Sequence, residues 1–224
     1  MPDIRIIETS DGSQSLYRKD LNETYHSTHG AITESQYVFI QHGLDFHSEQ
    51  GRESISILEV GFGTGLNALL TLDWAKSHEQ KITYSTLEPI PLAADIYTQL
   101  NYHELINGSV NQADLKHLHE AEWEQEHQLT DNFTFFKTQS KLQDFQSEKD
   151  FDLVYYDAFA PSKQAEMWDY DVLEKTADLM AEGAVLVTYC ARGQFKRDLA
   201  ALGLTVETLK GPPGKKEMVR GVKQ

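Results

Sequence analysis

The chain of 224 residues is long enough for one sizeable α/β domain with a short extension, but not for two full domains. Its formal net charge of -15 argues against a protein that coats nucleic acid with its whole surface. The sequence holds no run of about 18 apolar residues and no basic leader, so we expect no membrane helix or secretory signal and a cytoplasmic location. The single cysteine, Cys190, excludes an internal disulfide.

The first 50 residues are expected to form an extension that caps the remaining domain. Ile4 to Glu8 and Ser15 to Arg18 flank Asp11-Gly12, a pattern typical of a short hairpin. A helix is predicted over Ala31 to Gln41, with Gly43 near its end.

A polar loop precedes that helix. Thr24 to Ser35 contains Tyr25, His26, His29 and Glu34, and a loop of this kind often closes over a site. The two histidines have no clear third ligand, so we expect them to have a structural or substrate-contacting role rather than to bind a metal.

The segment Ile55 to Asn67, ISILEVGFGTGLN, predicts a buried strand, a tight turn and a helix. Three glycines in the turn follow the spacing G-x-G-x-G: Gly61, Gly63 and Gly65. The dinucleotide fingerprint G-x-G-x-x-G needs a glycine where this chain has Leu66, which makes NAD or FAD the weaker interpretation. Packing alone is the alternative explanation of the glycines.

Two acidic residues near the ends of strands in this part of the chain refine the choice of cofactor. Glu59, just before the turn, is unfavourable beside a pyrophosphate but can face the ammonium of a methionine moiety, which favours S-adenosylmethionine. Glu88 ends the predicted strand Lys81 to Leu87, about twenty residues after the turn, where a carboxylate can accept both ribose hydroxyls. A surface acid at a strand end is the alternative for Glu88. A helix is expected next, through Leu92, Ala93, Ile96, Tyr97 and Leu100.

The rest of the chain continues the alternation of strands and helices. A polar helix is predicted over Asn111 to Leu129. The expected strands are Asn132 to Lys137, Asp152 to Tyr156 and Gly183 to Tyr189, followed by a hairpin of Leu204 to Leu209 and Glu217 to Val222. This order predicts a mostly parallel α/β sheet with an antiparallel C-terminal hairpin, formed by a Rossmann-like domain over residues 51–224.

The clearest chemical motif is Phe151 to Pro161, FDLVYYDAFAP, an apolar strand that ends in Asp157. Strand carboxyl ends line the ligand crevice of an open α/β sheet, so Asp157 should share that crevice with Glu59 and Glu88. Its carboxylate could orient an amine nucleophile and accept a proton from it, and Phe159 offers a ring on which a base can stack. A helix N-cap beside a core phenylalanine is the alternative.

LEVGFGTGLN, the acid in TLEPIPL, YYDAFAPSKQAEMW and GPPGKKEM together resemble the methyltransferase domain of the MnmC-type tRNA-modifying proteins, over nearly the whole chain. The resemblance implies a class I methyltransferase fold and S-adenosylmethionine-dependent methylation of the 5-aminomethyl group of the wobble uridine in tRNA. Asp157 would be catalytic, and Phe159, Pro161, Met167 and Trp168 would shape the uridine side. The expected cofactor-binding residues are Glu59, Gly61, Phe62, Gly63, Thr64, Gly65, Asn67, Glu88, Gln139 and Asp157.

The chain departs from the family in two places. Many members are fused to a flavin-dependent oxidase, but no G-x-G-x-x-G follows within these 224 residues, so we expect no oxidase step here. Where such methyltransferases often place an acid near the adenine, this chain has Thr138, Gln139 and Ser140, so an amide or a hydroxyl is expected to replace the acid.

From Arg192 onward, basic residues outnumber acidic ones on an otherwise acidic chain. On charge alone, this region could equally be a solvated surface or a docking face for a polyanion. We expect the anticodon loop of tRNA to dock on this side, with Lys215 and Lys216 near phosphates and support from Arg192, Lys196 and Arg197. Enzymes that modify the wobble uridine would act upstream. The alternatives are a methyltransferase for a small-molecule amine and a noncatalytic RNA-binding module.

Overall fold

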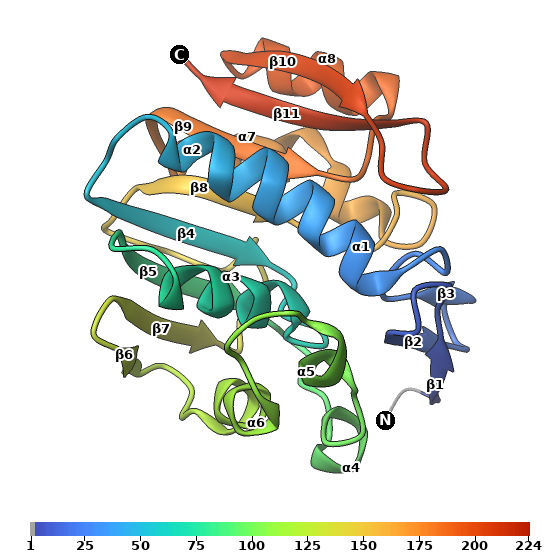
Figure 1. Ribbon diagram of the computed structural model, residues 1–224. Helices are drawn as coiled ribbons and strands as arrows, with labels where there is room; N and C mark the ends of the chain where they lie inside the picture. Colours follow the sequence, from blue (N-terminus) through green and yellow to red (C-terminus); the bar gives the residue numbers. More distant parts are fainter. Residues whose placement is uncertain (1–2) are drawn as a thin grey trace.

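A computed structural model describes residues 3–224 and shows a central sheet of eight strands beside a small sheet of three (Figure 1). The small sheet consists of β1 (Ile4–Glu8), β2 (Gln14–Arg18) and β3 (Glu23–Thr24). The large sheet consists of β4 (Ser54–Val60), β5 (Lys81–Leu87), β6 (Glu126–Thr130), β7 (Phe133–Thr138), β8 (Phe151–Tyr156), β9 (Met180–Thr188), β10 (Leu204–Lys210) and β11 (Glu217–Lys223).

The strand order of the large sheet is β10-β11-β9-β8-β4-β5-β7-β6. The five strands from β9 to β7 run parallel, while β11 and β10 at one edge and β6 at the other pair antiparallel. The predicted parallel sheet and C-terminal hairpin are therefore confirmed. The chain leaves β4 toward β5 and β7 and then returns to β8 on the other side of β4. This reversal creates a topological switch point between β4 and β8, where ligands bind in folds of this kind.

Helices cover both faces of the sheet because the inner strands are apolar on both sides. Along β8, Leu153 and Tyr155 join a core cluster with α3 (Leu66–Lys76). Val154 and Tyr156 join a second cluster with α7 (Tyr170–Asp178) and α8 (Gly193–Ala201). The helices that follow β4 in the chain are α3 (Leu66–Lys76), α4 (Ala94–Tyr97), α5 (Tyr102–Leu105), α6 (Gln112–Glu120), the 3-10 turn η2 (Ala165–Trp168), α7 (Tyr170–Asp178) and α8 (Gly193–Ala201).

One long helix crosses the same face of the sheet as α3 (Figure 1). It comprises α1 (Ala31–Ser35), the π-helical η1 (Gln36–Asp45) and α2 (Phe46–Ser48), so the predicted end near Gly43 is wrong. A Cβ atom at Gly43 would lie 2.9 Å from Cγ2 of Val187 on β9. The glycine thus permits close packing of helix on sheet instead of ending the helix.

The predicted helix over Asn111 to Leu129 is also wrong in its second half. The structure ends α6 at Glu120 and places Leu129 in β6, which pairs with β7. At its start, the Asn111 side chain accepts the Ala113 N–H at 2.8 Å. At its end, the ammonium of Lys137 donates to the carbonyl of Leu118 at 3.1 Å and so satisfies a group that the helix leaves unpaired.

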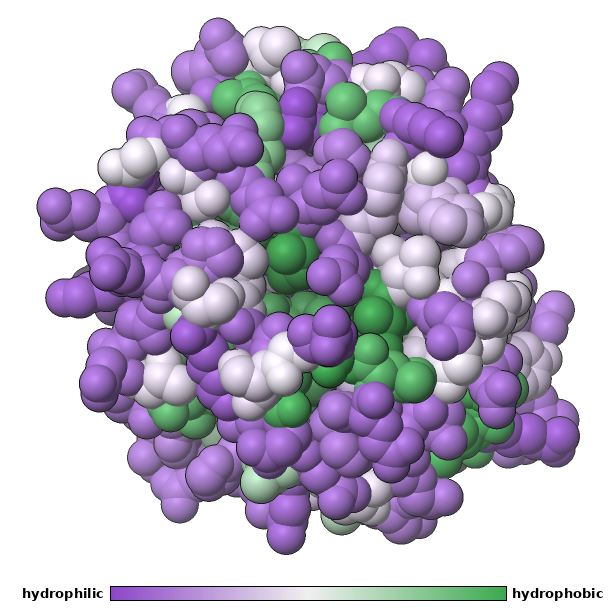
Figure 2. Space-filling model, in the orientation of Figure 1, coloured by the Kyte–Doolittle hydropathy of each residue, from purple (hydrophilic) through white to green (hydrophobic). Residues whose placement is uncertain are grey.

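The N-terminal segment shares its core with the central sheet. Leu16 of β2 and Phe39 of the long helix belong to the same hydrophobic cluster as Ile57 of β4. This cluster contains residues from both sides of position 51. The expected division of the chain into two parts at residue 51 therefore stays a prediction. The face over the long helix and α3 is mostly hydrophilic, with apolar side chains visible near its centre (Figure 2). No helix within residues 3–224 has the length and apolar character needed to span a membrane.

Candidate functional site

A cavity of about 1150 Å³ opens where β4, β5 and β8 end, at the switch point of the sheet. Residues that follow these three strands line it, and the loop between β2 and α1 supplies another wall. A cavity of this size is large enough for a nucleoside-bearing cofactor and part of a second ligand. The small sheet lies beside this edge in Figure 1.

The glycine turn begins directly after β4 and packs against the ends of both neighbouring strands. The N–H groups of Gly61 and Phe62 both donate to the carbonyl of Leu87, at 3.1 Å each. Gly61 has a φ of 96°, and a Cβ atom there would lie 2.9 Å from the carbonyl oxygen of Asp157. Only glycine can therefore bring the turn this close to the end of β8.

Glu88 follows β5 and fixes the turn from the opposite side. Its Oε2 accepts the N–H of Gly63 at 2.9 Å, and its Oε1 accepts the N–H of Ile90 at 2.8 Å. Burial raises the pKa of Glu88, while these two backbone N–H groups act in the opposite direction. Glu88 lines the cavity, and a carboxylate has about four acceptor positions, so it can accept hydroxyl groups of a ligand as well.

Asp157 follows β8 and lines the same cavity as Glu88. The side-chain amide of Asn67 on α3 donates to its Oδ2 at 2.9 Å. Burial raises the pKa of Asp157 to about 7, helped by the charge of Glu34, whereas Asn67 and Lys215 lower it. Asp157 lines the cavity and is half-buried. Such a group can exchange a proton with a ligand near neutral pH.

Glu59 is absent from the cavity wall, although we expected it to face the methionine moiety. Its side chain is fully buried in β4, and the hydroxyl of Thr86 donates to its Oε2 at 2.7 Å. Burial raises its pKa well above the ordinary value, and the nearby Asp157 charge adds to this effect. Glu59 therefore has a structural role within β4, next to the site.

The other residues expected to bind the cofactor divide into two groups. Phe62, Thr64 and Asn67 line the cavity together with Gly61 and Gly63. Gly65 does not, because it packs inward: a Cβ atom there would lie 3.0 Å from the Phe62 ring. Gln139 also lies outside the cavity wall, and its N–H donates to Oε1 of Glu124 at 3.1 Å. The segment 140–144 lines the cavity in its place.

The residues expected on the uridine side are only partly brought together. Phe159 and Met167 line the cavity, whereas Pro161 and Trp168 do not. Trp168 is 8% exposed, and its Nε1 donates to the carbonyl of Phe159 at 2.8 Å. It thus supports the loop that carries Phe159 instead of facing a ligand.

Two cavity residues opposite Phe159 come from the N-terminal segment. The Tyr25 ring meets the Phe159 ring edge to face, with centroids 5.0 Å apart. The guanidinium carbon of Arg18 lies 5.7 Å from the centroid of the Phe159 ring. The polar loop predicted to close over a site contains Tyr25, but no sequence signal pointed to Arg18.

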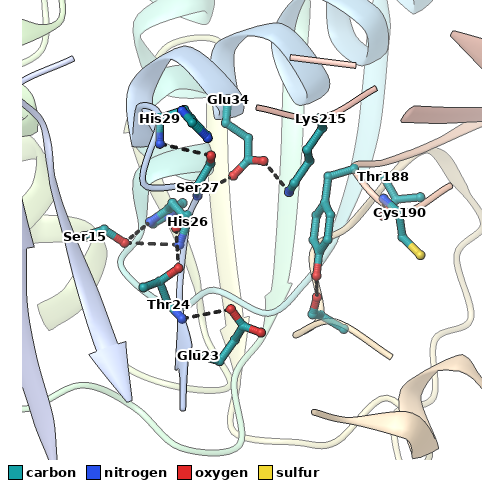
Figure 3. A network of polar contacts seen from close by, with 12 residues as sticks. Ser15, Glu23, Thr24, His26, Ser27, His29, Glu34, Thr188, Cys190 and Lys215 are labelled. Atoms are coloured by element: carbon teal, nitrogen blue, oxygen red, sulfur yellow. Dashed lines mark hydrogen bonds and ion pairs between the residues drawn. The ribbon is translucent and has the colours of Figure 1, made fainter. Parts of the chain in front are cut away.

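The two lysines expected near phosphates differ in their surroundings. Lys215 lines the cavity and forms an ion pair with Glu34, with Nζ and Oε1 2.5 Å apart (Figure 3). Lys216 is not part of the cavity wall. The helix α8 carries Lys196, which pairs with Glu217 at 3.4 Å. Among residues 3–224, no group of three or more His, Cys, Asp or Glu side chains is arranged to hold a metal ion.

The donor set of the cavity fits S-adenosylmethionine. Glu88 offers free acceptor positions for ribose hydroxyls, and the glycine turn leaves room for close approach to the backbone. Phe62 and Leu142 add apolar surface to the cavity. Asp157 adds a carboxyl group to the same cavity, next to the turn.

Comparison with known proteins agrees with this geometry. A family model described as S-adenosyl-L-methionine-dependent methyltransferase matches residues 101–224. The bifunctional protein MnmC of tRNA 5-methylaminomethyl-2-thiouridine biosynthesis from Cupriavidus metallidurans is 30% identical over 95% of this chain and 33% of its own. Its counterpart from Burkholderia thailandensis is 30% identical over 89% of this chain and 32% of its own. The chain thus spans about a third of the length of these relatives.

Among solved structures, MNMC2 from Aquifex aeolicus superposes with a TM-score of 0.81 at 24% identity, covering all of this chain and 71% of that one. This likeness shows a shared fold, that of the class I methyltransferases, and so confirms the expected fold class. The family model covers more than half of the chain, and the cavity fits the cofactor named in its description. The chain belongs to the S-adenosyl-L-methionine-dependent methyltransferase family and uses that cofactor as its methyl donor.

Proposed function

We propose that this methyltransferase acts on the 5-aminomethyl group of the wobble uridine in tRNA. The observation that carries the proposal is the position of Asp157, a carboxyl group with a pKa of about 7, in the same cavity as the glycine turn and Glu88. The names of the MnmC relatives support the choice of substrate, since they describe proteins of tRNA 5-methylaminomethyl-2-thiouridine biosynthesis.

Asp157 serves the reaction as a proton acceptor and orienting group. A primary amine must be neutral to attack a methyl group, and it must lose a proton once methylated. Asp157 accepts such a proton near neutral pH, and the amide of Asn67 holds the carboxylate in place at 2.9 Å. When bound, S-adenosylmethionine supplies an electrophilic methyl group on a sulfonium. Because no covalent intermediate with the protein is required, positioning accounts for much of the rate.

The uridine base is proposed to lie between the N-terminal segment and the loop after β8. Tyr25 and Phe159 provide aromatic surface there, and Arg18 adds a planar cation beside Phe159. Bases of unstacked nucleotides bind to proteins by stacking on such side chains. A wobble uridine turned out of the anticodon loop would reach the cavity in this way.

The C-terminal part of the chain is proposed to contact the tRNA backbone. Lys216 and Arg192 lie on segments whose basic residues outnumber the acidic ones, whereas the chain as a whole carries a formal charge of -15. Local positive charge on an acidic protein orients a polyanion as well as attracting it. Enzymes that install the aminomethyl group on the uridine would act before this protein.

Transfer of labelled methyl groups tests the proposed substrate directly. The purified protein is incubated with methyl-labelled S-adenosylmethionine and either tRNA that carries the unmethylated aminomethyl group or an extract of small metabolites. We expect label in the tRNA, and its loss in Asp157→Asn. Label in the metabolites alone would replace the proposal with a small-molecule amine substrate. Absence of turnover with both would favour a noncatalytic RNA-binding module.

A further inference from the structure

The ion pair of Glu34 and Lys215 is located inside the cavity. The side chains of Glu34 and Lys215 are only 7% and 28% exposed, and Figure 3 shows Glu34 between Lys215 and Ser27. Oε2 of Glu34 accepts the Ser27 N–H at 2.7 Å, so both carboxylate oxygens have a partner. Both charged residues line the same cavity as Asp157. Because removing a pair from water costs free energy, stability alone does not account for its position.

The pair is linked mechanically to the backbone beside Asp157. Nζ of Lys215 lies 3.6 Å from the centroid of the Tyr189 ring. The hydroxyl of Tyr189 donates to the carbonyl of Ala158, the residue after Asp157, at 2.8 Å. The loop that carries Lys215 is itself fixed, because a Cβ atom at Gly214 would lie 1.9 Å from the His29 ring. These contacts hold the charges in fixed positions relative to Asp157.

We propose that the Glu34–Lys215 pair is a positioning element for Asp157: it sets the protonation of this carboxyl group and with it the pH range in which a proton can leave the substrate. The second half of this statement rests on the proposed function. The negative charge of Glu34 raises the pKa of Asp157, and the positive charge of Lys215 lowers it. The two members of the pair thus act on Asp157 with opposite signs.

The remaining groups that face Asp157 come from other elements. They are Asn67 from α3, Glu59 from β4, Tyr84 from β5 and Tyr189 after β9. These groups are unchanged when only Glu34 or only Lys215 is replaced. If the pKa of Asp157 falls in one of these variants and rises in the other, the ion pair is therefore the cause.

Titration of Asp157 by nuclear magnetic resonance tests the proposal without any substrate. The protein is labelled with carbon-13 in its aspartate carboxyl groups, and the Asp157 signal is identified by its loss in Asp157→Asn. In Glu34→Gln, which keeps an acceptor for Ser27, the titration midpoint is expected to fall by on the order of one pH unit. In Lys215→Met it is expected to rise by a similar amount.

Two matched variants complete the experiment. Lys215→Arg keeps the charge and should keep the wild-type midpoint. Lys76→Met removes a lysine of similar exposure, 22%, that pairs with Asp114 at 3.0 Å away from the cavity, and should leave the midpoint unchanged. Midpoints that stay in place, or that move in the same direction in Glu34→Gln and Lys215→Met, would overturn the proposal.

Kinetics then separate this inference from the proposed function. The acidic limb of kcat/KM for tRNA should follow the same two opposite shifts, with little change in the affinity for S-adenosylmethionine. Opposite shifts in the titration together with label transfer only to small amines would overturn the tRNA substrate and leave the role of the pair intact. Normal methylation of tRNA, with the titration midpoint of Asp157 unchanged in both variants, would overturn the role of the pair and leave the tRNA substrate intact.

Discussion

At the scale of single residues, Asp157 combines a cavity position with a raised pKa. Burial is the largest cause of its raised pKa of about 7, and the Asn67 amide opposes the rise. Asp157→Asn removes the proton acceptor but keeps the shape of the side chain. We expect methyl transfer to fall by roughly 100-fold or more, the range for loss of a general base. Calorimetry should show S-adenosylmethionine affinity close to the wild-type value; full activity in the variant would exclude the assigned role.

The same substitution has a consequence for stability. The pKa of Asp157 rises from 3.8 to about 7 on folding, so between these pH values the native state binds more protons than the unfolded state. The contribution of Asp157 to stability is therefore present at low pH and lost as pH rises toward 7. Thermal unfolding should show Asp157→Asn more stable than the wild type at pH 8, with the difference disappearing by about pH 4. An advantage that is independent of pH would contradict the raised pKa of Asp157.

Glu88 gives a prediction for the cofactor. Its carboxylate already accepts two backbone N–H groups and has acceptor positions left for ribose hydroxyls. Glu88→Ala should weaken S-adenosylmethionine binding by roughly 1–3 kcal/mol, the range for hydrogen bonds to a charged group. Calorimetry measures this directly, and Glu124→Ala, which removes a carboxylate outside the cavity, is the control. Unchanged affinity in Glu88→Ala would place the ribose elsewhere.

At the scale of elements, Gly43 tests the packing of the long helix on the sheet. Its missing side chain leaves room for Val187, which a Cβ atom would approach to 2.9 Å. Gly43→Ala should lower the free energy of unfolding by about 1–3 kcal/mol, the usual cost of overpacking. In the control Gly193→Ala at the start of α8, the added atom meets only the flexible end of Arg197, at 3.3 Å. Denaturant titration should show a loss in the first variant only; a more stable Gly43→Ala would contradict the close contact.

The parallel strands and the C-terminal hairpin were predictable because their residues alternate or form apolar runs of strand length. The edge strand β6 was not, since its sequence EHQLT is polar and is held by pairing with β7. Its neighbouring residues continue the polar pattern of α6, which suggested one long helix. The predicted helix end near Gly43 was wrong for a related reason. A glycine can end a helix or permit close packing, and the sequence alone does not show that a sheet lies against this one.

The candidate site was predictable where a residue directly follows a strand. Gly61, Glu88 and Asp157 all do, and the parallel sheet brings their segments to one cavity. The direction of a side chain within a loop or strand cannot be read in this way. Glu59 therefore proved to be buried beneath the cavity, and Trp168 proved to be buried against the loop that carries Phe159.

At the scale of the whole molecule, charge predicts which face would meet the proposed tRNA substrate. Lys216 and Arg192 lie on the basic C-terminal part, whereas Lys215 is held by Glu34 in the cavity. The double variant Lys216→Glu, Arg192→Glu should raise KM for tRNA and reduce the slope of log KM against log salt by roughly one per lost phosphate contact. Binding of S-adenosylmethionine should not change.

Lys116→Glu on α6, near the opposite edge of the sheet in Figure 1, is the control, with one charge reversed where the double variant reverses two. It changes the net charge in the same direction, and it should leave both KM and the salt slope close to the wild-type values. Equal changes of KM and of the salt slope in the control and in the double variant would contradict the prediction. They would show that the net charge of the protein, and not the basic C-terminal part, governs its association with tRNA.

Mass spectrometry can compare wobble nucleosides from cells with this protein, without it and with only Asp157→Asn. The proposed reaction requires Asp157, at the switch point of the sheet, for methylation of an aminomethyl uridine. This requirement predicts that the unmethylated aminomethyl nucleoside accumulates in the cells that lack the protein and in those with Asp157→Asn, and that the wild-type protein removes it. Identical wobble nucleosides in all three would contradict the proposed reaction.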